Sequence, residues 1–505
     1  MKLNYKRTIL VGFAFFLISA FWQAYDAIVP LILTNHFGLP QFPSGAVMAL
    51  DNVLAVFLLP IFGALSDKVK TRFGKRTPFI VIGTVVAVSL FVVLTVVDGV
   101  QLNALAQSDI AERYRVAYSE FSVLKDSLNE LVKDKNPEAM EMLKNAEAAL
   151  NDVKVQLRRE ALDITLRNIW PLIGFMTVLL GLLVAMATFR SPAVALMPDV
   201  TIKPLRSKAN AIINLMGAAG GILVLGLGMV FATSKNIYMN YSGYVLAVVA
   251  IMLVGLTVFI TTVREKKWAR DMEEESERLG LNNEPVEDNS EKRKLSKPEL
   301  KSLVLILASV ALWYVGYNSI TSKYSVYATN ILGFDFNFTL IVAQAAAIIS
   351  YIPVGIVASK IGRRKTILAG VIMLASAFLI GAFISPTTPP IVMYPVFALA
   401  GIGWATINVN SFPMVVELAR GGEVGKYTGY YYTASMSAQI IAPLLAGGLY
   451  DLFDLFTNNN GMRIVFFPFA VLFVALSFVT MFFVKHGDAK PEKQGTLESL
   501  AGADD

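Results

Sequence analysis

Cysteine is absent from the 505-residue sequence, and histidine occurs only twice. Without cysteine the chain cannot form disulfides, thiolate metal sites or a cysteine nucleophile. His36 and His486 both fall outside the apolar segments of the sequence. A membrane-embedded enzyme needs catalytic groups such as a histidine cluster or a Ser/His pair, so we expect no enzymatic activity, no metal site and no cofactor.

Charge is also scarce. Charged residues make up 16% of the chain, whereas soluble domains usually contain about 25%. Hydrophobic residues make up 55%, and the mean hydropathy is +0.57. Long apolar runs explain this balance, because roughly 20 apolar residues suffice to span a bilayer. The net charge of +6 comes from basic residues in short loops between these runs, which indicates membrane topology and not nucleic-acid binding.

The apolar runs predict an all-α integral membrane protein with twelve transmembrane helices. The first run, 8–33, is too long for a signal peptide and is followed by no small-residue cleavage site, so we expect it to be retained. Lys and Arg are frequent in loops 66–77 and 359–365 but absent from loops 35–43 and 386–389. This bias predicts a multi-pass protein of the plasma membrane with both termini in the cytoplasm. The predicted helices are 8–34, 44–65, 78–98, 168–190, 207–232, 242–263, 302–322, 338–358, 366–385, 390–415, 427–448 and 463–484.

Two polar stretches interrupt the apolar pattern. Residues 264–301 carry dense charge of both signs, which is typical of a cytoplasmic linker that is partly helical or disordered. Residues 99–167 fall on the external side and contain two heptad patterns separated by Asn136-Pro137-Glu138, a typical helix start. We expect an external helical hairpin that acts as a lid, contacts an unknown partner or is a passive insertion. The predicted domains are an N-terminal six-helix bundle (1–263), the linker (264–301), a C-terminal six-helix bundle (302–485) and a polar tail (486–505).

The two halves of the chain repeat one another. Gly63-Ala-Leu-Ser-Asp67-Lys68, followed by Gly74-Lys75-Arg76, corresponds to Gly355-Ile-Val-Ala-Ser359-Lys360, followed by Gly362-Arg363-Arg364. In each half an acid, Asp199 or Glu417, then precedes a lysine by nine residues. The spacing from Gly74 to Asp199 is 125 residues and from Gly362 to Glu417 is 55, and the excess of 70 matches the hairpin. Duplication with one insertion explains these spacings.

The repeated loop resembles the signature loop of the major facilitator superfamily. Within it, Leu65-Ser66-Asp67-Lys68 and Arg72-Phe73-Gly74-Lys75-Arg76-Thr77-Pro78 resemble the version in sucrose–proton symporters, near the glycoside–pentoside–hexuronide cation symporters. Arg190-Ser191-Pro192 and Gly401-Ile-Gly-Trp404 are similar to that group as well. The resemblance implies a 12-helix major facilitator fold of two pseudo-symmetric six-helix bundles that acts as a secondary transporter. Ser359 departs from the pattern, which usually has an acid there, so a charge contact in the second half would be weaker or built differently.

Alternating access requires contacts at the cytoplasmic loops that form in one state and break in the other. We expect Asp67 to pair with Arg76 or Arg72, Asp199 with Arg206 or Lys208, and Glu417 with Arg420 or Lys426. An exposed ion pair contributes only about 0–1 kcal/mol, which allows it to switch. The alternative is that these cations only fix the topology. The candidate cytoplasmic gate comprises Asp67, Arg72, Gly74, Arg76, Arg190, Asp199, Arg206, Gly362, Arg363, Arg364, Glu417 and Lys426.

Two acids lie inside predicted helices. Asp26 and Asp51 occupy the outer halves of helices 1 and 2 at similar depth. A carboxylate at mid-bilayer costs roughly 2.5–3.5 kcal/mol, so its presence needs a reason. Removal from water makes a carboxylic acid easier to protonate, so either acid is a candidate for coupling transport to a proton. The alternative is a static contact with a polar group on a neighbouring helix.

Aromatic and amide side chains in several helices form the candidate substrate site. Sugars are commonly held by aromatic faces flanked by hydrogen-bonding groups, and helices 1 and 7 carry similar clusters in the repeat. Each residue alone is equally explained by interface anchoring or helix packing. Arg190 either extends to the cytoplasm or pairs with Asp199. The candidate substrate residues are Trp22, Gln23, Tyr25, Asn52, Asn210, Asn214, Trp313, Tyr317, Asn318, Gln344, Trp404, Asn408, Tyr431 and Gln439.

The favoured hypothesis is proton-coupled symport of a glycoside such as a disaccharide. The alternatives are an exporter or exchanger of another small organic solute, because fold alone does not fix the substrate, and a sensor without transport activity. An ATP-driven pump would need a Gly-x-x-x-x-Gly-Lys-(Ser/Thr) loop, which the sequence lacks; the nearest match, 421–427, misses both the glycine spacing and the hydroxyl.

Overall fold

The protein is helical throughout the part of the chain that its structure, a computed structural model, describes: residues 3–133, 136–202, 205–234, 237, 239–279, 295–386, 388–418, 424–457 and 459–487. Within these residues, ten helices are long and apolar enough to cross a membrane. α12 adds a shorter apolar stretch, Phe336–Tyr351, and α14 packs against α12 and α13. The expected fold of twelve spans is confirmed. They are α1 (Tyr5–Leu31), α2 (Gln41–Lys68), α3 (Thr77–Ala106), α6 (Trp170–Asp199), α7 (Arg206–Val230), α8 (Ser242–Thr262), α10 (Lys297–Thr321), α12 (Phe336–Ile361), α13 (Arg363–Gly381), α14 (Met393–Val416), α15 (Val424–Asp454) and α16 (Gly461–Phe482).

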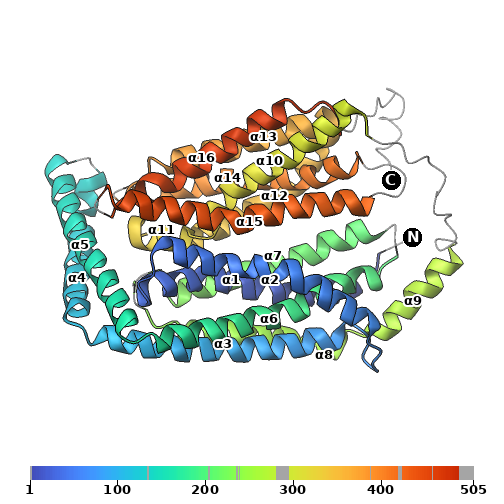
Figure 1. Ribbon diagram of the computed structural model, residues 1–505, viewed down its shortest axis with the longest axis horizontal. Coiled ribbons are helices and arrows are strands. Elements are labelled where there is room, and N and C mark those ends of the chain that lie inside the picture. Colours follow the sequence, from blue (N-terminus) through green and yellow to red (C-terminus); the bar gives the residue numbers. More distant parts are fainter. Residues whose placement is uncertain are drawn as a thin grey trace.

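The spans form two bundles of six helices (Figure 1). In the first half, α1 packs against α7 and α8, and α3 packs against α6 and α8. In the second half, α10 packs against α15 and α16, and α13 packs against α14 and α16. The halves meet where α2 packs against α15 and where α7 packs against α12. These two helix pairs therefore form the main contacts between the halves.

A helical hairpin connects α3 to α6. It consists of α4 (Asp109–Lys133) and α5 (Pro137–Arg167), and it stands outside the bundles at the end opposite the chain termini (Figure 1). The Asn136 side chain accepts a hydrogen bond from the amide of Ala139 at 3.1 Å, and Pro137 occupies the first turn, which confirms the predicted helix start. We call this end of the molecule the hairpin side and the opposite end the terminus side.

The first part of the linker belongs structurally to the first bundle. It forms α9 (Glu265–Arg278), a strongly amphipathic helix on the terminus side. The Arg7 guanidinium donates to the Asp271 carboxylate at 2.9 Å and lies over the Trp268 ring at 5.1 Å. These contacts fasten α9 to the start of α1. The remainder of the expected linker (280–294) and most of the expected tail (488–505) lie outside the described residues.

Beyond the predicted ends of the first and seventh predicted helices, which are α1 and α10, the chain forms π-helical turns. α1 runs into η1 (Ile32–His36), and α10 is followed by α11 (Tyr324–Tyr327) and η3 (Ala328–Leu332). The placement of His36 outside the apolar segments was wrong, because it is buried at the end of η1. Its Nδ1 atom lies 2.7 Å from the Asp98 carboxylate of α3. A buried polar partner thus makes an imidazole compatible with an apolar span.

The halves are joined on the hairpin side. Every hydrogen bond and ion pair between two described residues of opposite halves lies between the middle of the spans and this side. α2 and α15 approach closely there because glycines face the contact: a Cβ at Gly447 would lie 2.5 Å from the Gln41 carbonyl oxygen. Toward the terminus side the two bundles diverge (Figure 1). The structure therefore represents a state closed on the hairpin side.

Candidate functional site

The two intramembrane acids, on α1 and α2, lie close enough to interact electrostatically. Asp26 is exposed although its neighbours Tyr25 and Ala27 are buried, so its carboxylate faces the space between the bundles. Asp51 is half-buried, accepts a hydrogen bond from the Asn52 side chain at 2.8 Å and interacts electrostatically with Asp26. Asp26, Asp51 and Asn52, assigned from sequence to the coupling and substrate sites, thus form one cluster.

Arg190 belongs to this cluster and not to the terminus side. Its guanidinium lies over the Trp22 ring at 5.6 Å and interacts electrostatically with Asp51. Both sequence-based alternatives for Arg190, extension to the cytoplasm and pairing with Asp199, are therefore wrong. A cation within a span is stable only beside an anion or an aromatic face, and Arg190 has both. The arginine supplies a counter-charge for a carboxylate that would otherwise be isolated.

Aromatic rings surround the acids from both halves. Trp22 and Tyr25 make an edge-to-face contact at 5.3 Å in the first half. In the second half Tyr317 stacks on Trp404 at 5.7 Å and contacts Trp313 at 6.5 Å. Tyr317 also interacts electrostatically with Asp26, which places the second aromatic group against the acid cluster.

Three polar groups of these helices are buried and have no hydrogen-bond partner among the described residues. They are Trp22 Nε1, Trp313 Nε1 and Tyr25 Oη. Unpaired buried donors are unfavourable, and at a binding site they are available to a ligand. All three lie on the helices that the sequence assigned to substrate binding.

The amides of the candidate site divide into two groups. Gln344 donates to Gln23 at 2.5 Å, joining α12 to α1 across the halves. Asn408 hydrogen-bonds Tyr351, a tyrosine that sequence reasoning did not select. The remaining candidates have other partners or are exposed: Asn318 and Gln439 donate to carbonyl oxygens of their own helices, Tyr431 bonds Ser411, and Asn210 and Asn214 are exposed on α7.

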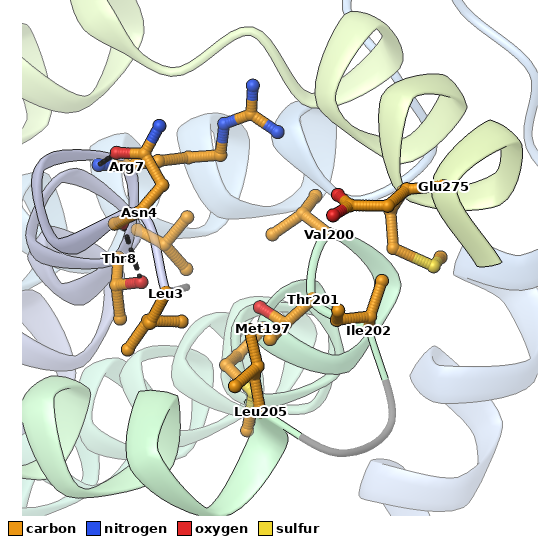
Figure 2. A pocket seen from close by; sticks show the side chains of 12 residues that line it. Leu3, Asn4, Arg7, Thr8, Met197, Val200, Thr201, Ile202, Leu205 and Glu275 are labelled. Carbon is orange, nitrogen blue, oxygen red and sulfur yellow. Dashed lines mark hydrogen bonds between the residues drawn. The ribbon is translucent and has the colours of Figure 1, made fainter. Parts of the chain in front are cut away.

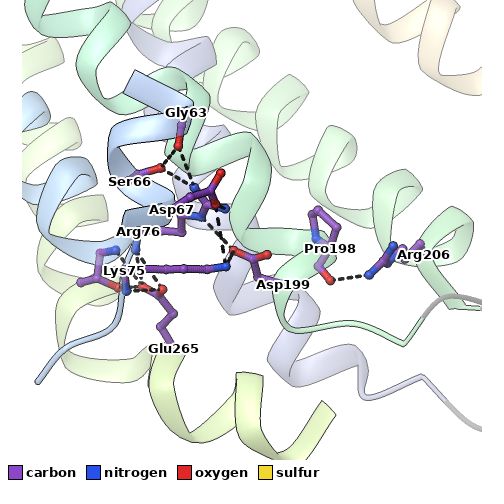
Figure 3. Close-up of polar contacts among 10 residues, drawn as sticks. Gly63, Ser66, Asp67, Lys75, Arg76, Pro198, Asp199, Arg206 and Glu265 are labelled. Carbon is purple, nitrogen blue, oxygen red and sulfur yellow. Dashed lines mark hydrogen bonds and ion pairs between the residues drawn. The ribbon is translucent and has the colours of Figure 1, made fainter. Parts of the chain in front are cut away.

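The signature loop of the first half forms a compact charge network on the terminus side (Figure 3). Arg76 pairs with Asp67, as expected, and its Nε atom donates to Asp199 at 2.8 Å. Lys75 approaches Asp199 at 3.2 Å, and Arg76 also contacts the Ser66 hydroxyl. One arginine thus links the ends of α2, α3 and α6 within the first half.

Glu265 completes this network, and sequence reasoning missed it. Its carboxylate accepts hydrogen bonds from the amides of Lys75, Arg76 and Thr77 at 2.7–2.9 Å, so it caps the start of α3 from α9 (Figure 3). An anion at a helix N-terminus is favourable because the free amides and the helix dipole point at it. Gly74, at φ +119°, is required beside it because any Cβ would collide with the Glu265 carboxylate. The sequence signal that could have identified Glu265 is the presence of a glutamate shortly after the sixth span.

Other expected gate pairs were wrong. Arg206 donates to the carbonyl oxygens of Pro198 and Thr201 and not to Asp199. Arg72 lies over the Phe73 ring at 4.6 Å, not beside Asp67. Asp67 and Asp199 are instead both engaged by Arg76.

In the second half, Glu417 pairs with Arg363, the residue after Gly362 at the start of α13. Of the two partners expected for Glu417, Lys426 is exposed and Arg420 lies outside the described residues. Arg364 donates to the Met481 and Phe482 carbonyl oxygens at the end of α16. The second half therefore has its own charge contact without an acid at 359.

A small pocket on the terminus side is separate from the cluster of acids. It lies between the start of α1, the end of α6 and α9, and Arg7, Thr201 and Glu275 contribute polar groups to its wall (Figure 2). All its lining residues belong to the first half and to α9. It therefore lies off the interface between the halves.

On the hairpin side, polar groups close the interface directly. The Asp451 carboxylate at the end of α15 accepts hydrogen bonds from the amides of Gln41 and Phe42, the first residues of α2, at 2.7 and 2.6 Å. Lys323 is buried and donates to the Ser44 hydroxyl at 2.6 Å. The carboxylate of one half thus caps a helix of the other half.

The two π-helical extensions meet in the same region. The side-chain amides of Asn35 and Asn330 exchange hydrogen bonds at 3.3 and 2.7 Å. π-helical turns are rare and frequent at functional sites. Sequence reasoning did not select either asparagine, because both fall beyond the predicted ends of their helices.

Comparison with known proteins identifies the family. A family model described as Major Facilitator Superfamily matches residues 164–443 and 338–502, and one described as MFS/sugar transport protein matches residues 10–106. Among curated proteins, none matches the chain.

Solved structures share the fold at low sequence identity. A D-xylose–proton symporter is 15% identical, with a TM-score of 0.59 over 96% of this chain and 99% of that one. The xylose transporter XylE from E. coli, in an inward open conformation, is 14% identical, with a TM-score of 0.59 over 98% and 100%. The nucleoside transporter NupG is 11% identical, with a TM-score of 0.56 over 95% and 100%. Together with the twelve spans in two bundles, the family match shows that the chain belongs to the Major Facilitator Superfamily and is a multi-pass membrane transporter.

Proposed function

We propose that the protein is a proton-coupled symporter of a glycoside such as a disaccharide, working by alternating access in the plasma membrane with both termini in the cytoplasm. The observation that carries this proposal is the cluster of Asp26, Asp51 and Arg190 beside aromatic rings from both halves. Terminus-side loops rich in Lys and Arg support the orientation. In that orientation the closed hairpin side faces the outside of the cell.

The cluster suggests how proton and sugar are coupled. Protonation of Asp51 removes its attraction for Arg190, which changes the contact between α2 and α6. Asp26 interacts electrostatically with Asp51 and with Tyr317 of the second half. A proton taken up here therefore alters charge at the surface where the halves meet. Coupling follows if substrate binding and protonation favour the same arrangement of the two halves.

The aromatic rings support a sugar as the substrate. Trp22 and the stacked pair Tyr317–Trp404 offer flat apolar faces, while the unpaired Trp22 Nε1 and Trp313 Nε1 offer hydrogen-bond donors. The loop motifs that resemble sucrose–proton symporters and glycoside–pentoside–hexuronide cation symporters point the same way, as does the sugar-transport family model over residues 10–106. The alternative is an exporter or exchanger of another small organic solute, a view favoured by the similarity in fold to a nucleoside transporter.

The test is uptake of labelled disaccharides into proteoliposomes with and without an inward proton gradient. We expect gradient-driven accumulation, and uptake that ignores the gradient would contradict proton symport. Asp26→Asn should abolish accumulation but retain sugar exchange, whereas Asp163→Asn, an exposed acid on the hairpin, should behave as the wild type. Uptake of nucleosides or other solutes without any glycoside would favour the alternative.

A further inference from the structure

The hairpin is fixed rigidly to the first half. The Thr165 hydroxyl of α5 donates to the Phe37 carbonyl oxygen at 2.9 Å and accepts from the Gln101 side chain of α3 at 3.0 Å. Gly38 has φ +66°, and a Cβ there would lie 2.5 Å from the Arg158 carbonyl oxygen. The chain after η1 is therefore pressed against α5. An apolar cluster that includes Leu105 of α3 together with residues of α4 and α5 closes the base of the hairpin.

The other face of the hairpin contacts the second half. Lys154 of α5 donates to the Asn330 carbonyl oxygen of η3 at 3.2 Å. Glu147 lies 3.8 Å from the Arg463 guanidinium at the start of α16. Arg158 interacts electrostatically with Asp454 at the end of α15. The hairpin thus spans the interface that closes the hairpin side, with contacts to three elements of the opposite bundle.

One carboxylate, that of Glu147, lies among the cations of this contact. Glu147 interacts with Lys125 of α4, Lys154 of α5 and Arg463 of the second half. Lys154 lies inside the interface, where burial and the neighbouring Arg158 lower its pKa to about 8. Lys154 and Arg158 are both half-buried, and clustered cations of this kind need a compensating anion. Loss of the Glu147 charge would leave cations of both halves facing each other.

The alternating-access movement determines which contacts of the hairpin must break. Alternating access separates the two halves on the side that opens. Because the hairpin is fastened to the first half and touches the second, its contacts with the second half must break in that step. Its contacts suit this task, because partly exposed ion pairs are weak and therefore easily broken.

We propose that the hairpin α4–α5 is an intramolecular strap that stabilises the closed hairpin side and releases the second half in each cycle, with Glu147 as the residue that holds it. This inference rests on the alternating access of the proposed function but not on the identity of the substrate. It assigns the insertion a conformational role and decides against a passive insertion.

The test measures the distance between the halves directly. The natural absence of cysteine allows Asn103→Cys in α3 and Ile391→Cys in η4 (Pro390–Val392), both exposed on the hairpin side, to be spin-labelled without background. Double electron–electron resonance in nanodiscs then gives the populations with this side closed and open. We expect Glu147→Gln to raise the open-to-closed ratio about threefold, which corresponds to roughly 0.7 kcal/mol.

Matched variants make the result specific. Asp163→Asn combined with Arg167→Gln removes an exposed ion pair from the same helix and should leave the ratio unchanged. Arg463→Gln added to Glu147→Gln should return the ratio toward the wild-type value, because it removes the cation left facing Lys154. An unchanged distance distribution in Glu147→Gln would overturn the proposal, as would an equal shift in the control. No sugar or proton gradient is needed, so failure of sugar transport leaves this readout intact.

Discussion

Closure of the hairpin side depends on the close approach of α2 and α15. We therefore predict that one methyl group added at Gly447 strongly destabilises the closed state. In Gly447→Ala the new Cβ would lie 2.5 Å from the Gln41 carbonyl oxygen and 2.8 Å from its carbon. That is about 0.8 Å short of the roughly 3.3 Å at which carbon ordinarily meets a carbonyl oxygen. Both neighbours are backbone atoms of a helix, so neither can turn away. Overpacking of this kind costs about 1–3 kcal/mol.

The cost applies only when the hairpin side is closed. The methyl group is free of the clash once α2 and α15 separate, so the open-to-closed ratio should rise by about 5- to 150-fold. The spin-label pair on α3 and η4 measures this ratio. Gly448→Ala is the matched control, because its Cβ would meet only Phe42 Cδ2, at 3.4 Å. A wild-type distance distribution in Gly447→Ala, with unaltered melting temperature, would refute the argument that this contact closes the molecule.

Further predictions concern charges outside the apolar centre. Asp451→Asn should raise the open-to-closed ratio about tenfold in the same assay, since it weakens two charge-assisted bonds to the start of α2; no shift would exclude this cap from closure. Glu265→Gln should lower the free energy of unfolding by about 1–2 kcal/mol in thermal melts, whereas Glu273→Gln on the same helix should not; equal effects would contradict the capping role. Between pH 8 and 10.5 a closed state with Lys154 at a pKa of about 8 binds fewer protons than an open state with a hydrated lysine. Raising the pH through this window should therefore favour closure, and below pH 8 Lys154 should contribute no pH dependence to the open-to-closed ratio. If the ratio in Lys154→Met depends on pH as strongly as in the wild type, another group causes the dependence.

Local signals predicted the spans and the ends of several elements. Apolar length alone located twelve helices, because the bilayer requires the same length of every span. The start of α5 at Asn136-Pro137 was predictable for a similar reason, since a cap and a first-turn proline act within four residues. The Asp67–Arg76 pair was also within reach, because one short loop contains both residues.

Contacts between distant segments escaped prediction. Glu265 caps α3 from a position about 190 residues away, and Arg190 reaches Trp22 from another helix. Hydropathy does not fix the rotation of a helix about its axis, and rotation decides which neighbours a side chain meets. Asp199 shows the result: the expected partner, Arg206, lies close in sequence, but packing brings Arg76 to it instead.

The reciprocal bond between Asn35 and Asn330 has an electrical consequence. Each amide gives and receives one hydrogen bond, so the contact forms and breaks without moving a net charge. A unit charge carried across the membrane field changes in energy by about 2.3 kcal/mol for every 100 mV. A neutral contact is insensitive to that voltage. The junction of the two π-helical turns can therefore open and close without a direct energetic contribution from the membrane potential.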